Sequence, residues 1–298
     1  MLFLGLPGIS RRLHAWVDKV PSQCAVCHAW PSQRVCNACV MRFAQPATRC
    51  QRCALRVPAG VAVCGACLQN PTSFDACIAA VDYAYHWADA LAQFKFRGDP
   101  GWARALATLM RSTPWMEPAL EAADRVLAVP LSTERLRERG FNQSALLARQ
   151  LAGTKADCHT LLRLRATEAQ SGLPRAQRLR NLRGAFAVEP ARAASLRGQR
   201  VVLIDDVMTT GATLHAATLA LREAGVAHVT AAVLARTSCH RGRSRLQSGR
   251  LRWLYLAKGL LLTGQGESVL AFRITIISTE RRPGLPRVVS SPSAAENS

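Results

Sequence analysis

The chain has no stretch that is long and apolar enough to cross a lipid bilayer, which excludes a protein built from membrane-spanning helices. Its opening apolar run stands before Arg11 and Arg12, the reverse of the order in a secretory signal peptide, and no obvious small-residue cleavage site follows. Lysine is also scarce, at four of the 39 basic residues, a bias typical of a GC-rich genome. We therefore expect a cytoplasmic protein.

Acidic residues are few compared with basic ones, 19 against 39, which leaves a net charge of +20. Such a balance favours polyanionic partners, namely nucleic acid or phosphorylated substrates. Residues 238–298 alone hold ten basic and three acidic side chains and so contribute +7. Ionised thiols at two all-cysteine zinc sites would remove about four further charges. The sequence thus predicts a moderately basic protein.

The stretch VVLIDDVMTTGAT, residues 201–213, carries the strongest functional signal. Val201–Ile204 predict a buried parallel strand that ends at two carboxylates, Asp205 and Asp206, and an apolar-periodic helix follows from Leu214. Adjacent carboxylates are good acceptors for the two hydroxyls of a ribose cis-diol. A helix start suits a phosphate, to which threonine hydroxyls and the close backbone approach of a glycine contribute. The predicted phosphate-binding residues are Thr209, Thr210, Gly211, Ala212 and Thr213.

Other interpretations explain only part of this stretch. A strand that ends in LIDD also suits the acidic cluster of a metal-dependent signalling receiver or the metal-binding acid of a nucleotidase, but neither fold needs TTGAT directly afterwards. A structural interpretation, in which Thr209 or Thr210 merely caps a helix, explains the threonines but not two exposed acids. We favour a sugar-phosphate site.

The stretch resembles the phosphoribosyl-pyrophosphate (PRPP) signature of type I phosphoribosyltransferases. The resemblance implies that Asp205 and Asp206 hold the ribose hydroxyls, that residues 209–213 hold the 5′-phosphate, and that Mg²⁺ accompanies PRPP. Either aspartate could serve as a general base, although hydroxyl binding is the expected role. In that family a loop that follows an early strand binds pyrophosphate through an arginine or lysine. RVLAVPL, residues 125–131, predicts such a strand, and the candidates that follow it are Arg135, Arg137 and Arg139, with Asn142 and Gln143 as polar helpers.

The arginines have simpler interpretations too. Those after residue 131 also suit an ordinary solvated basic helix face. A third basic cluster, residues 166–188, does not form a clean amphipathic helix. It is either a mobile flap that closes over the site, with Arg175, Arg178 or Arg183 reaching an anion, or a solvent-facing connector.

Eight of the 11 cysteines form four CxxC pairs, and each pair can direct both sulfurs at one point. Two pairs complete a tetrahedral thiolate cage for a structural zinc ion, so four pairs allow two cages. Pairing of nearest neighbours closes the shortest loops. Disulfides are the competing interpretation, but nothing directs the chain to an oxidising compartment. The predicted sites are Cys24, Cys27, Cys36 and Cys39, and Cys50, Cys53, Cys64 and Cys67.

Few large apolar residues lie between residues 21 and 70, so this segment cannot fold on a core of its own, and metal would supply the missing stability. We expect an N-terminal helix over 1–20, a double zinc ribbon over 21–72, an α/β domain over 75–237 and an atypical tail over 238–298. Within the α/β domain the pattern predicts a strand at 77–83, helices at 87–94 and 102–110, and a last strand at 229–237.

The motifs taken together are similar to those of the ComF family, bacterial phosphoribosyltransferase-like proteins linked to natural competence. They occur in order over about residues 20–237: the CxxC pairs, QFKFRG (93–98), VPL…RLRERGFNQ (129–143), Q…GL…R…N…GAF (170–186) and VVLIDDVMTTGAT. The resemblance implies a double zinc ribbon, a type I phosphoribosyltransferase-like parallel sheet with helices on both faces, and a role in the use of incoming single-stranded DNA. The tail departs from the family, whose members usually stop after the last strand. It is either a disordered or out-of-frame appendage or a genuine extra element.

Three functions follow from these observations. The first is a ComF-like protein that binds PRPP and acts in the uptake and use of external DNA, with single-stranded DNA and a competence helicase as partners. The second is an active phosphoribosyltransferase of nucleotide salvage. The third is a non-catalytic zinc-ribbon adapter that binds DNA. The sequence does not identify a nucleobase acceptor or an oligomeric state.

Overall fold

A computed structural model describes residues 22–165 and 184–238, which all belong to one compact unit spanning Met1–Ser244. The predicted helix over 1–20 lies outside the described residues, as do residues 166–183 of the predicted flap and residues 239–298 of the predicted tail. Within the described ranges, no helix combines the length and the apolar character that a membrane span requires.

From β1 onward, helices and strands alternate along much of the chain, as in other α/β proteins. The strands are β1 (Ala76–Asp82), β2 (Arg125–Ala128), β3 (Ala156–Asp157), β4 (Leu161–Arg163), β5 (Phe186–Val188), β6 (Arg200–Met208) and β7 (His228–Arg236). The helices are α2 (Asn37–Phe43), α3 (Gly65–Gln69), α4 (Trp87–Phe96), α5 (Trp102–Arg111), α6 (Met116–Glu121), α7 (Thr133–Arg139), α8 (Gln143–Ala152), α10 (Pro190–Ala193) and α11 (Ala212–Glu223).

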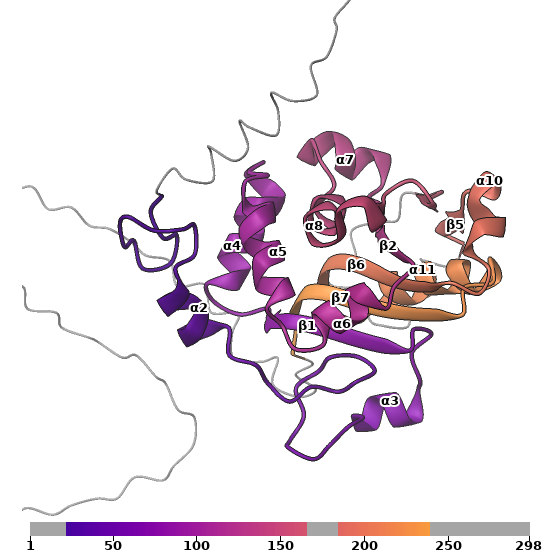
Figure 1. The fold of residues 1–298 in the computed structure, drawn as a ribbon, viewed down its shortest axis with the longest axis horizontal. Coiled ribbons are helices and arrows are strands. Elements are labelled where there is room, and N and C mark those ends of the chain that lie inside the picture. Colours follow the sequence, from indigo (N-terminus) through magenta and orange to yellow (C-terminus); the bar gives the residue numbers. More distant parts are fainter. Residues whose placement is uncertain (1–21, 166–183, 239–298) are drawn as a thin grey trace, which may run out of the picture. The chain divides into compact units, whose positions relative to one another are not determined.

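Five strands form one parallel sheet in the order β1-β7-β6-β2-β3 (Figure 1). The central strand β6 places Val202 beside Thr230 of β7 and beside Val126 of β2. Strands β4 and β5 form a separate antiparallel pair. Because parallel strands are joined by crossovers that lie on the sheet, both faces of such a sheet are covered.

Alternate residues of the central strands belong to two hydrophobic clusters, since successive strand side chains point to opposite faces. On one face, Val202 and Ile204 pack in a cluster with α4, α5, α6 and α8, and Figure 1 shows α4, α5 and α8 on the same side of the sheet. On the other face, Val201 and Leu203 pack with α11 and the β4–β5 pair. The predicted parallel sheet with helices on both faces is confirmed.

The predicted elements of the α/β part agree with the structure to within a few residues, as β1, α4, α5 and β7 illustrate. Strand β6 is longer than predicted. It continues past Ile204 through both aspartates to Met208, because β7 continues to pair with it and places Val233 beside Asp205. The acidic doublet therefore lies within the strand and not after it.

Candidate functional site

The order of the strands reverses between β2 and β6. From β2 the chain passes to β3 on one side, whereas from β6 it passes to β7 on the other side. Open parallel sheets bind ligands at the carboxyl ends of the strands that flank such a switch point. Strand β2 ends at Ala128, which lies beside Ile204, so β6 runs on past it and carries Asp205 and Asp206 to the switch point.

Asp206 forms an ion pair with a residue that the charge pattern of the sequence had not singled out. Its Oδ1 lies 2.7 Å from Nζ of Lys95, in the last turn of α4, and the two side chains are only 11% and 17% exposed. Lys95 belongs to the QFKFRG motif, so its only signal in the sequence was the family resemblance. A partly buried lysine beside a carboxylate also brings positive charge to the place where an anionic ligand is predicted.

Asp205 has different partners. Its Oδ1 accepts a hydrogen bond from Ser144 Oγ (3.1 Å), at the start of α8, and another from the backbone N–H of Asp206 (2.9 Å). Burial and, after it, the charge of Asp206 raise the pKa of the Asp205 carboxyl to about 7, against the opposing effects of the Asp206 N–H and Lys95. The doublet thus consists of one carboxylate paired with a lysine and one carboxyl that titrates near neutrality.

The turn between β6 and α11 contains Thr209, Thr210 and Gly211. Gly211 is the N-cap of α11 with φ of 77°, and a Cβ at this position would lie 2.6 Å from Cε of Met208. The left-handed backbone therefore favours glycine, whereas the contact with the tip of the flexible Met208 side chain can be relieved by a change of rotamer. Thr210 Oγ1 accepts from the N–H of Ala212 (3.4 Å), and Thr213 is half-buried in the first turn of the helix. The predicted residues 209–213 thus surround the amino end of α11.

The segment after β2, predicted as a pyrophosphate loop, contains a short helix, α7. Ser132 caps it by accepting from the N–H of Arg135, and Gly140 ends it with φ of 75°. Arg137 is exposed on α7, whereas Arg139 donates from Nη1 to Oε1 of Gln143 (3.1 Å). The arginines therefore lie on a helix, as the alternative interpretation held.

The next residues join this segment to the doublet. Asn142 caps α8 by accepting from the N–H of Ser144 (3.0 Å), and it donates to the carbonyl of Val129 (3.0 Å). Gln143 is fully buried, and within the described ranges its Nε2 has no hydrogen-bond acceptor. Ser144, its neighbour in the chain, donates to Asp205, so this buried donor belongs to a residue adjacent to a direct partner of the acidic doublet.

Arg163, in β4, is a further charged residue of the site that sequence reasoning missed. It interacts electrostatically with Asp205 and with Arg135, and burial together with the charge of Arg135 lowers the pKa of its guanidinium. No local pattern marked it, because β4 is a three-residue strand. Strand β4 pairs with β5, and the two strands are separated in the sequence by residues outside the described ranges.

The cysteines form two clusters, with the nearest-neighbour pairing that was predicted. In each cluster the four Sγ atoms lie within 4.8 Å of one another: Cys24, Cys27, Cys36 and Cys39 form the first cluster, and Cys50, Cys53, Cys64 and Cys67 the second. Separations between cysteines of different pairs are 3.6–3.9 Å, far longer than a disulfide bond of about 2.05 Å. Each cluster can hold one metal ion, whereas disulfides do not fit this geometry.

Backbone groups favour thiolates in both clusters. The N–H of Cys36 donates to Sγ of Cys24 (3.4 Å), and the N–H of Cys64 donates to Sγ of Cys50 (3.2 Å). Burial opposes ionisation, but the backbone hydrogen bonds outweigh it and lower the pKa of Cys24 to about 6 and that of Cys50 to about 7. Because the thiolate is the metal ligand, these contacts prepare the clusters for a cation.

The two clusters pack on opposite faces of the sheet. The first shares a hydrophobic cluster with α4 and α5, and Arg34, near it in the chain, donates to Asp99 (2.7 Å). The second shares the opposite hydrophobic cluster with α11, and nearby Arg49 donates to Asp82 (2.8 Å). The cysteine segment is therefore bound to the sheet on both sides.

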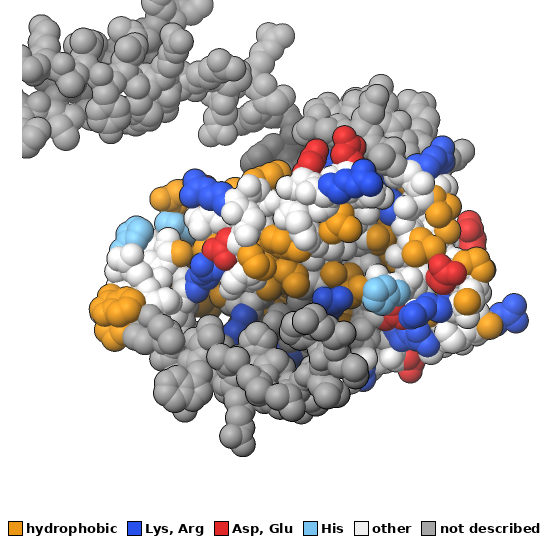
Figure 2. Space-filling model, turned by 90° about the horizontal axis from the view of Figure 1, so that it is seen from above, with side chains coloured by type: hydrophobic (Ala, Val, Ile, Leu, Met, Phe, Trp, Pro, Cys, Tyr) orange, Lys and Arg blue, Asp and Glu red, His pale blue; other side chains and the backbone are white. Residues whose placement is uncertain are grey.

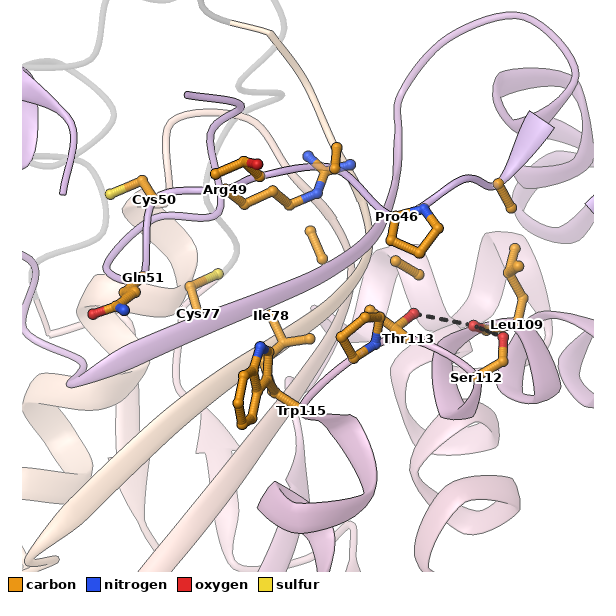
Figure 3. Close-up of a pocket in the computed structure, with 16 residues that line it drawn as sticks. Pro46, Arg49, Cys50, Gln51, Cys77, Ile78, Leu109, Ser112, Thr113 and Trp115 are labelled. Atoms are coloured by element: carbon orange, nitrogen blue, oxygen red, sulfur yellow. Dashed lines mark hydrogen bonds between the residues drawn. The ribbon is translucent and has the colours of Figure 1, made fainter. Parts of the chain in front are cut away.

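A cavity of about 280 Å³ lies elsewhere, between residues 44–51, the outer edge of β1 and residues 109–115 (Figure 3). It is lined by small and apolar side chains such as Pro46 and Leu109, and by none of the predicted PRPP-binding residues. In the same view Gln51 lies beside Cys77, whose N–H donates to the Gln51 carbonyl (2.8 Å). This contact fixes the second cysteine cluster to the edge of the sheet.

The basic side chains do not gather in one patch on the face drawn in Figure 2. Lysine and arginine side chains are spread there among apolar and acidic ones. The high net charge therefore does not by itself locate a nucleic-acid interface on this face.

Comparison with known proteins adds an independent line of evidence. Residues 139–249 match the phosphoribosyl transferase domain family. The chain is 34% identical over 227 residues to the DNA utilization protein YhgH of Salmonella typhimurium, which covers 73% of this chain and 98% of that protein. It is 37% identical over 139 residues to the competence protein ComFC of Bacillus subtilis, covering 47% of this chain and 55% of that one. For competence protein F of Haemophilus influenzae the identity is 32% over 181 residues, covering 58% and 78%.

The fold agrees with these matches. The parallel sheet, the two cysteine clusters that precede it and the matched phosphoribosyl transferase domain occur in the predicted order. Similarity to a DNA utilization protein extends over nearly all of that relative. The chain is therefore a member of the ComF family, with a phosphoribosyltransferase-like domain that follows two cysteine clusters.

Proposed function

We propose that the carboxyl edge of β6 binds PRPP. Asp205 and Asp206 accept hydrogen bonds from the ribose hydroxyls, and the turn of residues 209–213 binds the 5′-phosphate at the start of α11. Arg139, Gln143 and Arg163 are proposed to bind the pyrophosphate, because Arg139 donates to Gln143 and Arg163 interacts electrostatically with Asp205. The observation that carries the proposal is the meeting of an acidic doublet and a glycine-capped helix start at the switch point of the sheet.

The surroundings of the doublet support an anionic sugar as the ligand. Lys95 and Arg163 place positive charge around two carboxylates that otherwise would repel a phosphate. The buried Nε2 of Gln143 is a donor without an acceptor in the described part of the chain, and buried donors are normally satisfied by protein, water or ligand. Pyrophosphate oxygens are acceptors of the required kind.

Two kinds of metal fit the chemistry of the donors. Four thiolates at each cysteine cluster suit Zn²⁺, which at a site closed by four sulfurs has a structural role. Mg²⁺ prefers oxygen ligands and keeps several waters, so it would enter with the pyrophosphate of PRPP, near the carboxylates. The unbonded state of the ten described cysteines supports the predicted cytoplasmic location.

The site suits phosphoribosyl transfer or PRPP sensing. In a transfer reaction the bond between ribose C1 and the pyrophosphate oxygen breaks, an acceptor bonds to C1, and pyrophosphate leaves. The protein would position the sugar and stabilise charge on the leaving group. In a sensor the same contacts would hold PRPP without turnover. The names of the relatives, which refer to DNA utilization and competence, favour a role in the use of DNA. The family resemblance of the sequence adds single-stranded DNA and a competence helicase as proposed partners.

Calorimetry with PRPP and Mg²⁺ tests the site. At pH 8, where Asp205 is ionised, we expect Asp205→Asn and Asp206→Asn each to weaken binding at least tenfold, because each removes a carboxylate. Glu223→Gln, an exposed carboxyl at the end of α11, is the matched control and leaves affinity unchanged. Wild-type protein that fails to bind PRPP would refute the proposal.

Two further assays separate the functions. Pyrophosphate release in the presence of a nucleobase would identify an enzyme, whereas PRPP binding without release would favour the adapter. A gel shift with single-stranded DNA at increasing salt tests nucleic-acid binding. If basic side chains carry it, affinity falls steeply as counterion release becomes less favourable. Binding that is insensitive to salt would contradict that interface.

A further inference from the structure

Arg236 is the last residue of β7 and is 4% exposed, although it carries a charge. A buried guanidinium needs hydrogen-bond partners to offset the loss of water. Its Nε donates to the carbonyl of Cys53 (2.9 Å). Its Nη1 donates to the carbonyls of Met208 (3.1 Å) and Thr209 (2.6 Å), and to that of Thr237 (2.6 Å). One side chain therefore joins a residue of the second cysteine cluster to the turn that precedes α11.

These contacts fix the orientation of the turn. In a planar trans peptide, the C=O of one residue and the N–H of the next point in opposite directions. Because the carbonyls of Met208 and Thr209 are directed at Arg236, the N–H groups of Thr209 and Thr210 are directed away from it. Those N–H groups belong to the turn in which the 5′-phosphate of PRPP is proposed to bind.

The second cysteine cluster is well placed to hold Arg236 in turn. Cys50, Cys53, Cys64 and Cys67 share one hydrophobic cluster with Met208, Ala212 and Leu214, which surround the turn. Sγ of Cys77, in β1, lies 3.7 Å from Sδ of Met208, and Cys77 is also bonded to Gln51 (Figure 3). The first cysteine cluster packs on the other face of the sheet and has no part in this arrangement.

We propose that Arg236 is a positioning residue that couples the second cysteine cluster to the phosphate-binding turn. A metal ion held by Cys50, Cys53, Cys64 and Cys67 fixes the Cys53 carbonyl, and Arg236 passes that constraint to Met208 and Thr209. Metal loss from this cluster then weakens binding of a pentose 5-phosphate. The inference rests on the proposed function, because it concerns the affinity of the same site.

The test compares two ligands that occupy different parts of the site, ribose 5-phosphate and pyrophosphate, each with Mg²⁺ and full-length protein. Arg236→Met removes every donor and is expected to lower ribose 5-phosphate affinity at least tenfold while pyrophosphate affinity stays within twofold. The lysine in Arg236→Lys can reach only some of these carbonyls, so we expect an intermediate loss of ribose 5-phosphate affinity. Arg34→Met is the matched control, because Arg34 lies beside the first cysteine cluster and bonds to Asp99.

The second experiment removes the metal with a chelator and measures the metal content directly. Chelation of wild-type protein is expected to reproduce the loss of ribose 5-phosphate affinity, and chelation of Arg236→Met to add nothing, because the coupling is already broken. In Arg34→Met, chelation is expected to act as in wild type. Retained pyrophosphate binding shows that the metal-depleted protein is folded. If metal depletion unfolds the protein, the inference is tested by the affinities of Arg236→Lys and Arg236→Met for ribose 5-phosphate and for pyrophosphate.

The outcomes are distinct. Wild-type affinity for ribose 5-phosphate in Arg236→Met would overturn the inference and leave the proposed function intact. A parallel loss of both ligands would show a general structural role and also overturn it, as would additive effects of metal removal and the substitution. Wild-type protein that binds neither PRPP nor ribose 5-phosphate would overturn the proposed function, and this inference with it.

Discussion

Replacement of Asp205 by asparagine should make the protein more stable at high pH while it weakens PRPP binding. The pKa of this carboxyl is raised from 3.8 to about 7, because the side chain is buried and lies beside the charge of Asp206. Between these two values the folded protein holds a proton that the unfolded chain has released. Stability from this group is therefore full below the unfolded pKa and is lost as the pH rises towards the folded pKa.

The structure sets an upper bound on the effect. A shift from 3.8 to about 7 corresponds to at most about 4 kcal/mol of lost stability above pH 7. Asparagine keeps an oxygen that can accept from Ser144 and from the N–H of Asp206, but it carries no charge. The difference in free energy of unfolding between Asp205→Asn and wild type should therefore be small near pH 4, grow between pH 4 and pH 7, and level off above pH 7.

Urea unfolding at pH 4, 5, 6, 7 and 8 measures this difference, with Glu223→Gln as the control for loss of an exposed carboxyl. Calorimetry over the same range should show that wild-type affinity for PRPP increases with pH as Asp205 ionises, whereas the variant shows no such increase. A constant stability difference between the variant and wild type from pH 5 to pH 8 would refute the assigned titration. A gain in stability together with a loss of binding is the trade-off expected of a functional site.

Three further predictions concern the turn, the metal clusters and the core. Gly211→Ala places a Cβ on a left-handed backbone, so it should destabilise the protein by about 1–3 kcal/mol and weaken PRPP binding; a wild-type melting temperature and affinity would contradict this. Chelation should release two metal ions per chain and lower the melting temperature, and metal analysis that finds fewer than two ions in pure protein would argue against two zinc sites. Phe94→Ala, at a fully buried position in α4, should cost about 3–5 kcal/mol in urea unfolding, and a cost below about 1 kcal/mol would mean that this helix is not packed as described.

Local patterns predicted the parts of the site that are continuous in the sequence. The buried strand, the acidic doublet and the glycine turn of residues 201–213 lie together because they are neighbours in the chain, and the CxxC pairs form two clusters for the same reason. The arginines after residue 131 lie on α7, which agrees with the helical one of their two interpretations, and Ser132 and Gly140 bound this helix as is typical of helix ends.

Other contacts depend on the tertiary fold and leave no local trace. Lys95 meets Asp206 only because α4 packs over the face of the sheet that carries Ile204. Arg163 reaches the site on a three-residue strand, and Ser144 does so because α8 begins at the edge of β2. Propensity and periodicity describe a segment on its own, so they cannot indicate such partners.

The attachment of the cysteine segment to both faces of the sheet has a consequence for any attempt to divide the protein. A fragment that began at residue 75 would lose the first cysteine cluster from the face of α4 and α5, and the second from the face of α11. Apolar side chains on both sides would then meet water, and Arg236 would lose the Cys53 carbonyl. Proteolysis should therefore yield no stable sheet domain freed of the cysteine segment, which forms part of the layers that cover the sheet and is not an appendage to it.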